Sequence, residues 1–268
     1  MSVAATSPPR VGDLLREWRQ RRRLSQMDLS NEAEVSARHL SFVETGRSKP
    51  SRELLLHLAE HLDVPLRDRN GMLLAAGYAP VYKETSLDDE AMGPVRAALD
   101  KILTSHQPCP AVIVDRRWDI VSANDAALAI LTEDVDPALL QPPVNALRVS
   151  LHPDGLARRI VNLDEYSAHL ITRLDRQAAM SSDTRLDELL QELRSYPGVS
   201  ETSNIAVAPA DLLFAPLVLR SRGNELTFFS TLATFGTALD ITLAELSIES
   251  FYPGDAATED ALRRAAAS

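Results

Sequence analysis

The sequence predicts a two-domain protein in which an all-α domain precedes an α+β domain with an antiparallel sheet. The chain has 268 residues, which is long for one ordinary domain and sufficient for two. Apolar residues recur with helical spacing through residues 11–76, whereas short β-prone runs begin only after residue 110. The charge is also segregated: residues 1–80 carry 12 Lys+Arg and 10 Asp+Glu, and residues 81–268 carry 16 and 28. A basic-leaning module joined to an acidic one is a weak sign that the first part faces nucleic acid.

Composition indicates a globular protein, with 45% hydrophobic and 25% charged residues. The longest apolar stretch, residues 212–219, is far shorter than the roughly 20 residues that cross a membrane. The single cysteine, Cys109, cannot form an intramolecular disulfide, and the N-terminus lacks the apolar region of a secretory signal. We therefore expect a cytoplasmic protein without membrane association.

The first domain, residues 10–80, should contain five helices after a disordered N-terminus of nine residues. The first helix should cover residues 11–22, with an apolar face of Val11, Leu14, Leu15 and Trp18. The second should begin at Ser25, a helix N-cap with Asp28 three residues on, and the third at Ser36, ending before Gly46. The last two should cover residues 52–62 and then extend from Pro65 to near Gly77.

The second domain should follow a linker at residues 81–93, extend over residues 94–254, and end in a C-terminal tail or helix at residues 255–268. Its expected helices cover residues 94–103, 124–131 and much of 145–196, with a break at 152–155. Its expected strands cover residues 111–115, 118–123, 213–220, 226–235 and 241–251. Short turn segments separate the last three strands, which predicts an antiparallel meander.

The second and third helices of the first domain are separated by a turn too short for anything but two crossing helices, as in a helix-turn-helix. Such a motif places its second helix in the major groove. On that helix, Arg38, Ser41 and Phe42 fall on the face opposite to the apolar residues. Because arginine pairs with guanine and an apolar ring contacts the thymine methyl, we expect these three residues to contact bases. Phe42 has the alternative of packing on the fourth helix.

Other residues near this motif suit the DNA backbone or the interior of the domain. An amide, a hydroxyl and three cations should contact phosphates: Gln26, Ser36, Arg47, Lys49 and Arg52. The alternative for these side chains is a solvated surface. Arg19 and Glu44 lie near the apolar seam and should form a structural ion pair between the first and third helices.

The sequence gives little support to an enzyme. His57, Glu60 and His61 have the spacing of an inverted zinc-peptidase motif, but no third ligand is evident nearby. His152 and Asp154 share one turn and have no nucleophile motif beside them. We therefore expect no catalytic residue, no metal site and no cofactor.

Several motifs carry a resemblance to a known family. In the first half these are Leu24-Ser25-Gln26, Val35-Ser36, Arg38-His39-Leu40-Ser41-Phe42-Val43-Glu44-Thr45-Gly46-Arg47 and Leu74-Ala75-Ala76-Gly77-Tyr78-Ala79-Pro80. In the second half they are Asp115-Arg116-Arg117-Trp118, Leu151-His152-Pro153-Asp154-Gly155 and Ser230-Thr231-Leu232-Ala233-Thr234-Phe235-Gly236-Thr237. The first set resembles the phage-repressor-like helix-turn-helix of XRE regulators, and both sets resemble the MmyB-like branch of that family. The resemblance implies a PAS-like C-terminal domain that binds a lipophilic small molecule such as a fatty acid. Tyr166 and Ala238 depart from the tryptophan and proline expected there, which affects the shape of the pocket.

The resemblance favours a pocket between the meander and its covering helices, whereas the residues alone favour a solid core without a cavity. One face of the meander should carry Phe228, Leu232, Ala244, Leu246 and Ile248. The expected pocket residues are Tyr166, Leu170, Leu174, Phe214, Arg220, Phe228, Leu232, Leu246 and Ile248, with Arg220 as candidate for a ligand carboxylate.

Together these features predict a ligand-responsive, sequence-specific transcriptional regulator. A single small helix-turn-helix makes few phosphate contacts, so we expect a homodimer on double-stranded DNA. The alternative is a regulator whose second domain serves only as a dimerisation or protein-partner module without a small-molecule ligand.

Overall fold

The computed structural model describes residues 9–200 and 216–267 and divides them into two compact units. The first unit contains the described residues up to Thr85 together with Ala238–Ala244, and the second contains the remainder. The expected disordered N-terminus and the start of the expected strand 213–220 lie outside the described residues.

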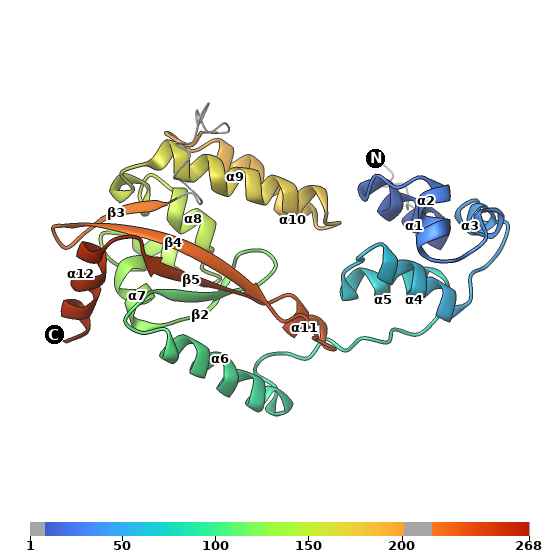
Figure 1. Ribbon diagram of the computed structural model, residues 1–268, viewed down its shortest axis with the longest axis horizontal. Helices are drawn as coiled ribbons and strands as arrows, with labels where there is room; N and C mark the ends of the chain where they lie inside the picture. Colours follow the sequence, from blue (N-terminus) through green and yellow to red (C-terminus); the bar gives the residue numbers. More distant parts are fainter. Residues whose placement is uncertain (1–8, 201–215, 268) are drawn as a thin grey trace, which may run out of the picture. The chain divides into compact units, whose positions relative to one another are not determined.

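The first unit is the all-α domain that the sequence predicts (Figure 1). Its helices are α1 Val11–Arg21, α2 Gln26–Glu32, α3 Ala37–Glu44, α4 Arg52–His61 and α5 Leu66–Ala75. Three serines begin successive helices, because the side chains of Ser25, Ser36 and Ser51 each accept a hydrogen bond from a backbone N–H in the first turn. Asp28 completes a capping box with Ser25, as expected.

Close packing of α1 against α3 fixes the position of the third helix. Leu15, Trp18 and Leu40 are almost fully buried in the core between these helices. Gly12 lies so close to α3 that a Cβ atom there would be 2.4 Å from the carbonyl oxygen of Val43. The close approach of the two backbones therefore requires glycine at position 12 of α1.

The segment Ala238–Ala244 joins the first unit although both of its neighbouring strands belong to the second. Ile241 is buried, and its backbone N–H donates to the Lys83 carbonyl at 2.8 Å. The Thr85 hydroxyl donates to the Asp240 carboxylate at 2.6 Å, and that carboxylate also accepts from the backbone N–H of Thr242. The prediction of a strand over residues 241–251 is thus wrong for its first part. Residues Ile241–Ala244 form the short helix α11, which packs against α5, so these contacts override the local strand preference.

The second unit is an α+β domain built on one five-stranded antiparallel sheet (Figure 1). Its strands are β1 Ala111–Val114, β2 Ile120–Ala123, β3 Leu217–Ser221, β4 Asn224–Thr234 and β5 Ser247–Pro253, in the order β2-β1-β5-β4-β3. Its helices are α6 Gly93–Ser105, α7 Asp125–Leu131, α8 Ala146–Leu151, α9 Leu163–Ala179, α10 Thr184–Arg194 and α12 Ala256–Ala266, with short 3-10 turns at Glu90–Met92, Pro137–Leu140 and Ala157–Arg159. The expected meander of the last three strands is present, and the arrangement is that of a PAS-like domain.

The strand register decides which side chains face the covering helices. Phe228 pairs with Leu217 and Pro253, and Leu232 pairs with Glu249, so all of these share the face that α9 covers. Ile248 pairs with Ile113 and Ala233 and therefore points to the opposite face. The expectation that Ile248 and Phe228 share a face is wrong, because the register of β4 with β5 places Glu249, and not Ile248, on the face of Phe228.

Candidate DNA-binding surface and ligand cavity

The helix α3 presents the three expected base-contacting residues on its outer side. Arg38 is exposed, and Ser41 and Phe42 are half-buried. The guanidinium groups of Arg38 and Arg47 lie 5.4 and 6.0 Å from the centre of the Phe42 ring. Phe42 does not belong to the buried core of the first unit, so an aromatic ring with two cations over it remains available on this surface.

The five expected phosphate-contacting residues lie at the helix ends and in the loop after α3. Arg47, Lys49 and Arg52 are exposed. Ser36 is exposed but already accepts a hydrogen bond from the backbone N–H of His39. The side-chain amide of Gln26 donates to the Glu44 carboxylate at 2.7 Å, which leaves its carbonyl oxygen for other contacts.

The structure joins Arg19 and Glu44 by two hydrogen bonds of 2.7 and 2.9 Å in the interior of the first unit. Burial alone would raise the pKa of Glu44, but the hydrogen bonds from Arg19 and Gln26 outweigh it and hold the pKa below its usual range. A charged, doubly bonded pair therefore connects α1 with the end of α3. The bond from Gln26 to Glu44 was not expected from the sequence, because a glutamine amide at this position also suits a phosphate.

The apparent zinc-peptidase motif on α4 has a structural explanation. The Nε2 atom of His57 lies 2.8 Å from the Ala33 carbonyl oxygen, and the rings of His57 and His61 meet edge to face. Among residues 9–200 and 216–267, no group of three or more His, Cys, Asp or Glu side chains is placed to hold a metal ion. The same part of the chain contains no helix with the length and apolar character needed to cross a bilayer.

The second unit contains a narrow apolar cavity of about 60 Å³ between the sheet and helices α7, α8 and α9, which we call the inner cavity. Three of the expected pocket residues, Tyr166, Leu170 and Phe228, line it. Further apolar lining comes from both ends of the domain: Val112, Trp118, Ile120, Ala127, Leu147, Leu156, Leu217, Leu219 and Phe251. Burial raises the pKa of Tyr166 well above its usual range, so its hydroxyl stays protonated.

The remaining expected pocket residues lie elsewhere. Leu174 and Leu246 are buried but do not line the inner cavity, and Phe214 lies outside the described residues. Arg220 is exposed on β3, because it alternates with the inward-facing Leu219. Arg220 therefore does not reach the inner cavity.

Glu249 is a polar residue of the inner cavity that sequence reasoning missed. It occupies the position opposite Leu232, and its Oε1 accepts hydrogen bonds from Ser230 at 3.0 Å and Arg173 at 3.2 Å. The only available signal was an acidic residue in a β-prone segment, and without the register such a residue is indistinguishable from one at an exposed strand position.

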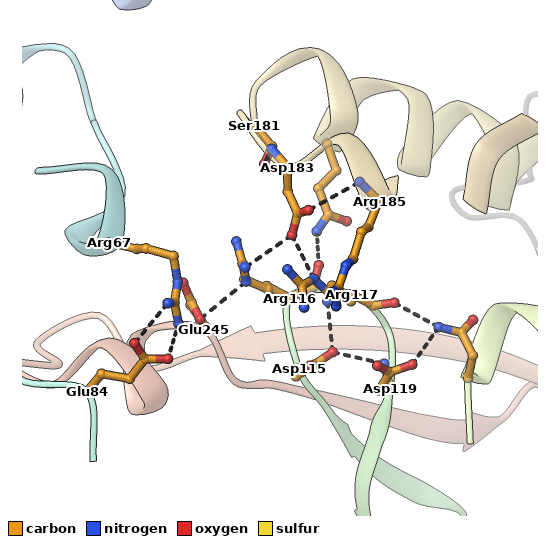
Figure 2. A network of polar contacts seen from close by, with 12 residues as sticks. Arg67, Glu84, Asp115, Arg116, Arg117, Asp119, Ser181, Asp183, Arg185 and Glu245 are labelled. Carbon is orange, nitrogen blue, oxygen red and sulfur yellow. Dashed lines mark hydrogen bonds and ion pairs between the residues drawn. The ribbon is translucent and has the colours of Figure 1, made fainter. Parts of the chain in front are cut away.

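The β1–β2 hairpin connects the cavity wall to the junction of α9 and α10. Trp118 lies in the hairpin turn with φ +68°, where the sequence had predicted the start of a strand. Its indole N–H donates to Gln177 at 2.8 Å. Figure 2 shows Arg116 and Arg117 beside Asp183, the N-cap of α10, at 3.1 and 2.7 Å.

Arg116 also reaches Glu245, the residue that follows α11, at 3.5 Å (Figure 2). Burial alone would raise the pKa of Asp183, but the hydrogen bonds from the Arg117 side chain and the Arg185 backbone, with the charges of Arg116 and Arg117, outweigh it and hold the pKa below its usual range. Through its ion pairs with Asp183 and Glu245, Arg116 thus connects the cavity wall with the start of α10 and with the end of the β4–β5 connection.

Comparisons with known proteins agree with this architecture. A helix-turn-helix domain family matches residues 10–70, and the family described as the MmyB-like transcription regulator ligand binding domain matches residues 95–265. No curated protein matches the sequence. Among solved structures, the chain is similar to one described as "Structure of an RNA-binding Light-Oxygen-Voltage Receptor", with 13% sequence identity and a TM-score of 0.28, over 97% of this chain and 62% of that one. That similarity is too low to carry an argument.

Both matched families are regulatory. The ligand-binding family alone covers more than half of the residues, and it follows a helix-turn-helix domain in the order that the structure shows. The chain therefore belongs to the MmyB-like family of transcription regulators.

Proposed function

We propose that this protein is a homodimeric, sequence-specific DNA-binding regulator of the XRE type that responds to a lipophilic small molecule such as a fatty acid. The observation that carries the proposal is the segment Ala238–Ala244, which belongs to the DNA-binding unit while its flanking strands, β4 and β5, line the ligand-binding domain's cavity. A movement of β4 or β5 can therefore reach the DNA-binding unit through this segment as well as through the linker.

The outer face of α3 supports sequence-specific binding. Arg38 and Phe42 lie where a recognition helix meets base edges, and the arginine and lysine side chains after α3 are suited to phosphates. The buried Arg19–Glu44 pair holds α3 against α1, so this face is positioned before DNA arrives. A single small helix-turn-helix makes few phosphate contacts, so we expect two copies to bind two half-sites about one helical turn apart.

The size of the inner cavity supports a response to ligand. Sites for small molecules usually enclose roughly 300–1,000 Å³, whereas this cavity encloses about 60 Å³. An acyl chain can enter only if the walls formed by α7, α8 and α9 move outward. Binding and a change of conformation are therefore the same event, as a ligand-controlled switch requires.

The route to DNA runs through β4 and β5. Phe228 and Phe251 on these strands line the inner cavity, and the same strands continue into the segment that contacts α5. The Thr85 hydroxyl and the Asp240 carboxylate anchor that segment at 2.6 Å. Displacement of the strands by a ligand would pull on α5, which packs on α1 and α4.

The proposal is tested by footprinting the full-length protein on DNA from upstream of its own gene, with and without dodecanoate. We expect dodecanoate to change DNA affinity at least about five-fold, within the usual range of allosteric coupling. Thr85→Val removes the hydroxyl without changing side-chain volume, and it should bring the ratio of affinities with and without dodecanoate toward one. Thr132→Val, at the end of α7, is the matched control and should leave the ratio unchanged.

Two results would count against the proposal. Absence of a footprint on any DNA would overturn the function assigned to α3. If DNA binds but neither dodecanoate nor any lipid extracted from the purified protein changes its affinity, the second domain is better explained as a dimerisation module.

A further inference from the structure

A second cavity, of about 300 Å³, lies next to the inner cavity and nearer to the C-terminal end of α9. Its cationic lining residues are Arg116, Arg173 and Arg176, and its apolar ones include Val114, Met180 and Leu232. We call it the arginine cleft. Leu232, which the sequence placed in the ligand pocket, lies here and is 43% exposed.

The two cavities share a wall. Trp118 lines both of them, and Arg173 of the arginine cleft bonds Glu249 of the inner cavity at 3.2 Å. The guanidinium of Arg173 lies 4.4 Å from the centre of the Trp118 ring. Moving along α9, the lining changes from Tyr166 and Leu170 to charged residues within one helical turn.

The arginine cleft contains cationic groups that can bind an anion. The Nη2 atom of Arg173 is buried and has no hydrogen-bond partner among the described residues. A buried charged donor without a partner is costly, so an anion bound at that position would be stabilised. Arg176, one turn further on the same helix, is exposed and forms no ion pair within the described part of the chain.

The nearby acidic groups already have partners. Asp115, the only acidic residue in the lining, accepts hydrogen bonds from the backbone N–H groups of Arg117 and Asp119 at 2.8 and 2.9 Å. Asp183 and Glu245 pair with Arg116, and Glu249 contacts a different nitrogen of Arg173, its Nη1. Arg173 Nη2 and Arg176 are therefore the two groups that remain for a bound anion.

We propose that the arginine cleft binds the anionic head group of an amphiphilic ligand whose apolar chain enters the inner cavity past Trp118. This inference rests on the proposed function, because it identifies the head-group chemistry of the ligand whose chain the inner cavity takes. Arg173 and Arg176, three residues apart on one helix face, present two guanidinium groups to one carboxylate. The head group would thus bind to α9, the helix that must move when the chain enters.

The experiment uses the full-length protein with Trp18→Phe, so that Trp118 is the single tryptophan and its fluorescence reports occupancy. The probes are dodecanoate, the uncharged dodecanol and acetate. We expect dodecanoate to bind at least about ten-fold more tightly than dodecanol, as a charge-assisted hydrogen bond provides, and acetate to bind far more weakly than either.

Two variants test the assigned residues. Arg176→Gln alters an exposed side chain and should preserve the fold, and the double substitution Arg173→Met with Glu249→Gln removes the ion pair without leaving a lone buried charge. Each should lower dodecanoate affinity toward that of dodecanol, and for Arg176→Gln, which lies outside the inner cavity, the affinity for dodecanol should stay within about two-fold of the parent. Arg263→Gln, an exposed arginine on α12, is the control and should change neither value.

The outcomes separate the two proposals. Equal affinity for dodecanoate and dodecanol, or a preference that survives both variants, overturns the head-group assignment alone. Acetate binding as tightly as dodecanoate also overturns it, because the chain would then contribute nothing. If neither dodecanoate nor dodecanol binds, the proposed lipid response fails together with this inference.

Discussion

Replacing Glu44 by glutamine should destabilise the first unit more than any surface substitution can. Glu44 is 1% exposed and accepts hydrogen bonds from Arg19 at 2.7 and 2.9 Å and from Gln26 at 2.7 Å. The substitution leaves the Arg19 guanidinium buried opposite a neutral amide, and breaking a buried pair by removing one partner costs about 3–5 kcal/mol. For a domain of this size, that loss lowers the melting temperature by roughly 12–40 °C, at about 4–8 °C per kcal/mol.

The assay follows thermal unfolding of the full-length protein by the fluorescence of Trp18, which is buried between α1 and α3, in a Trp118→Phe background. Glu17→Gln is the matched control, because Glu17 forms an exposed ion pair with Arg21 on the same helix as Arg19. It should cost less than about 1 kcal/mol. If Glu44→Gln costs no more than Glu17→Gln, the buried pair does not stabilise the position of α3 and the reasoning is refuted.

The same pair predicts how stability depends on pH. The pKa of Glu44 in the folded protein lies below its unfolded value, so the folded state binds fewer protons than the unfolded state in that range. The stabilisation should therefore be fully present above about pH 4.3, the usual glutamate pKa, and be lost as pH falls through the lower folded value. Trp18 unfolding curves at decreasing pH measure this, and Glu44→Gln should show a flatter dependence.

Three further predictions follow from individual contacts. Gly12→Ala should cost about 1–3 kcal/mol and weaken DNA binding, because its Cβ would clash with the backbone of α3, whereas Gly71→Ala, with open space around it, should stabilise α5 slightly in the same melting assay. Asn124→Ala should cost at least about 1–3 kcal/mol, since that buried side chain serves two backbone N–H groups and two carbonyl oxygens; retention of full stability by chemical denaturation would contradict this. Arg38→Ala should relax base preference in a binding-site selection, whereas Arg52→Ala should weaken all sequences alike and reduce the slope of log affinity against log salt by about one; an unchanged preferred sequence for Arg38→Ala would contradict the proposed docking face.

The sequence determined most of the first unit because its signals are local. Serines that cap helices, apolar residues three and four apart and a two-residue turn act within a few positions, so the starts of α1 to α4 lie within one residue of the expected ones. The Arg19–Glu44 pair could be anticipated as well, since both residues lie on the edges of apolar faces that must meet.

In other parts of the chain, the local sequence was not sufficient to predict the structure. Ile241 and Thr242 favour a strand, yet they form α11 because the neighbouring Asp240 caps the backbone N–H of Thr242 and the carbonyl of Lys83, from a distant part of the chain, binds the N–H of Ile241. Tyr166 and Leu170, which were expected in the pocket, line the inner cavity, because a helix face is readable from spacing. Arg220 and Ile248 were also expected there but do not line it, because the face of a strand residue depends on its register.

Glu249 and Arg173 illustrate what only the tertiary structure decides. Neither residue differs in sequence from an ordinary surface residue of a strand or a helix, and 76 positions separate them. The antiparallel register turns Glu249 inward, and α9 carries Arg173 over the same face, so a charged pair and an unpartnered buried nitrogen arise between two cavities. The sequence by itself determined most of the elements, their order and the helix-turn-helix, because these depend on interactions between near neighbours. The cavity, its polar boundary and the attachment of the β4–β5 segment to the first unit were decided by the fold, since each depends on contacts between residues that the sequence does not bring together.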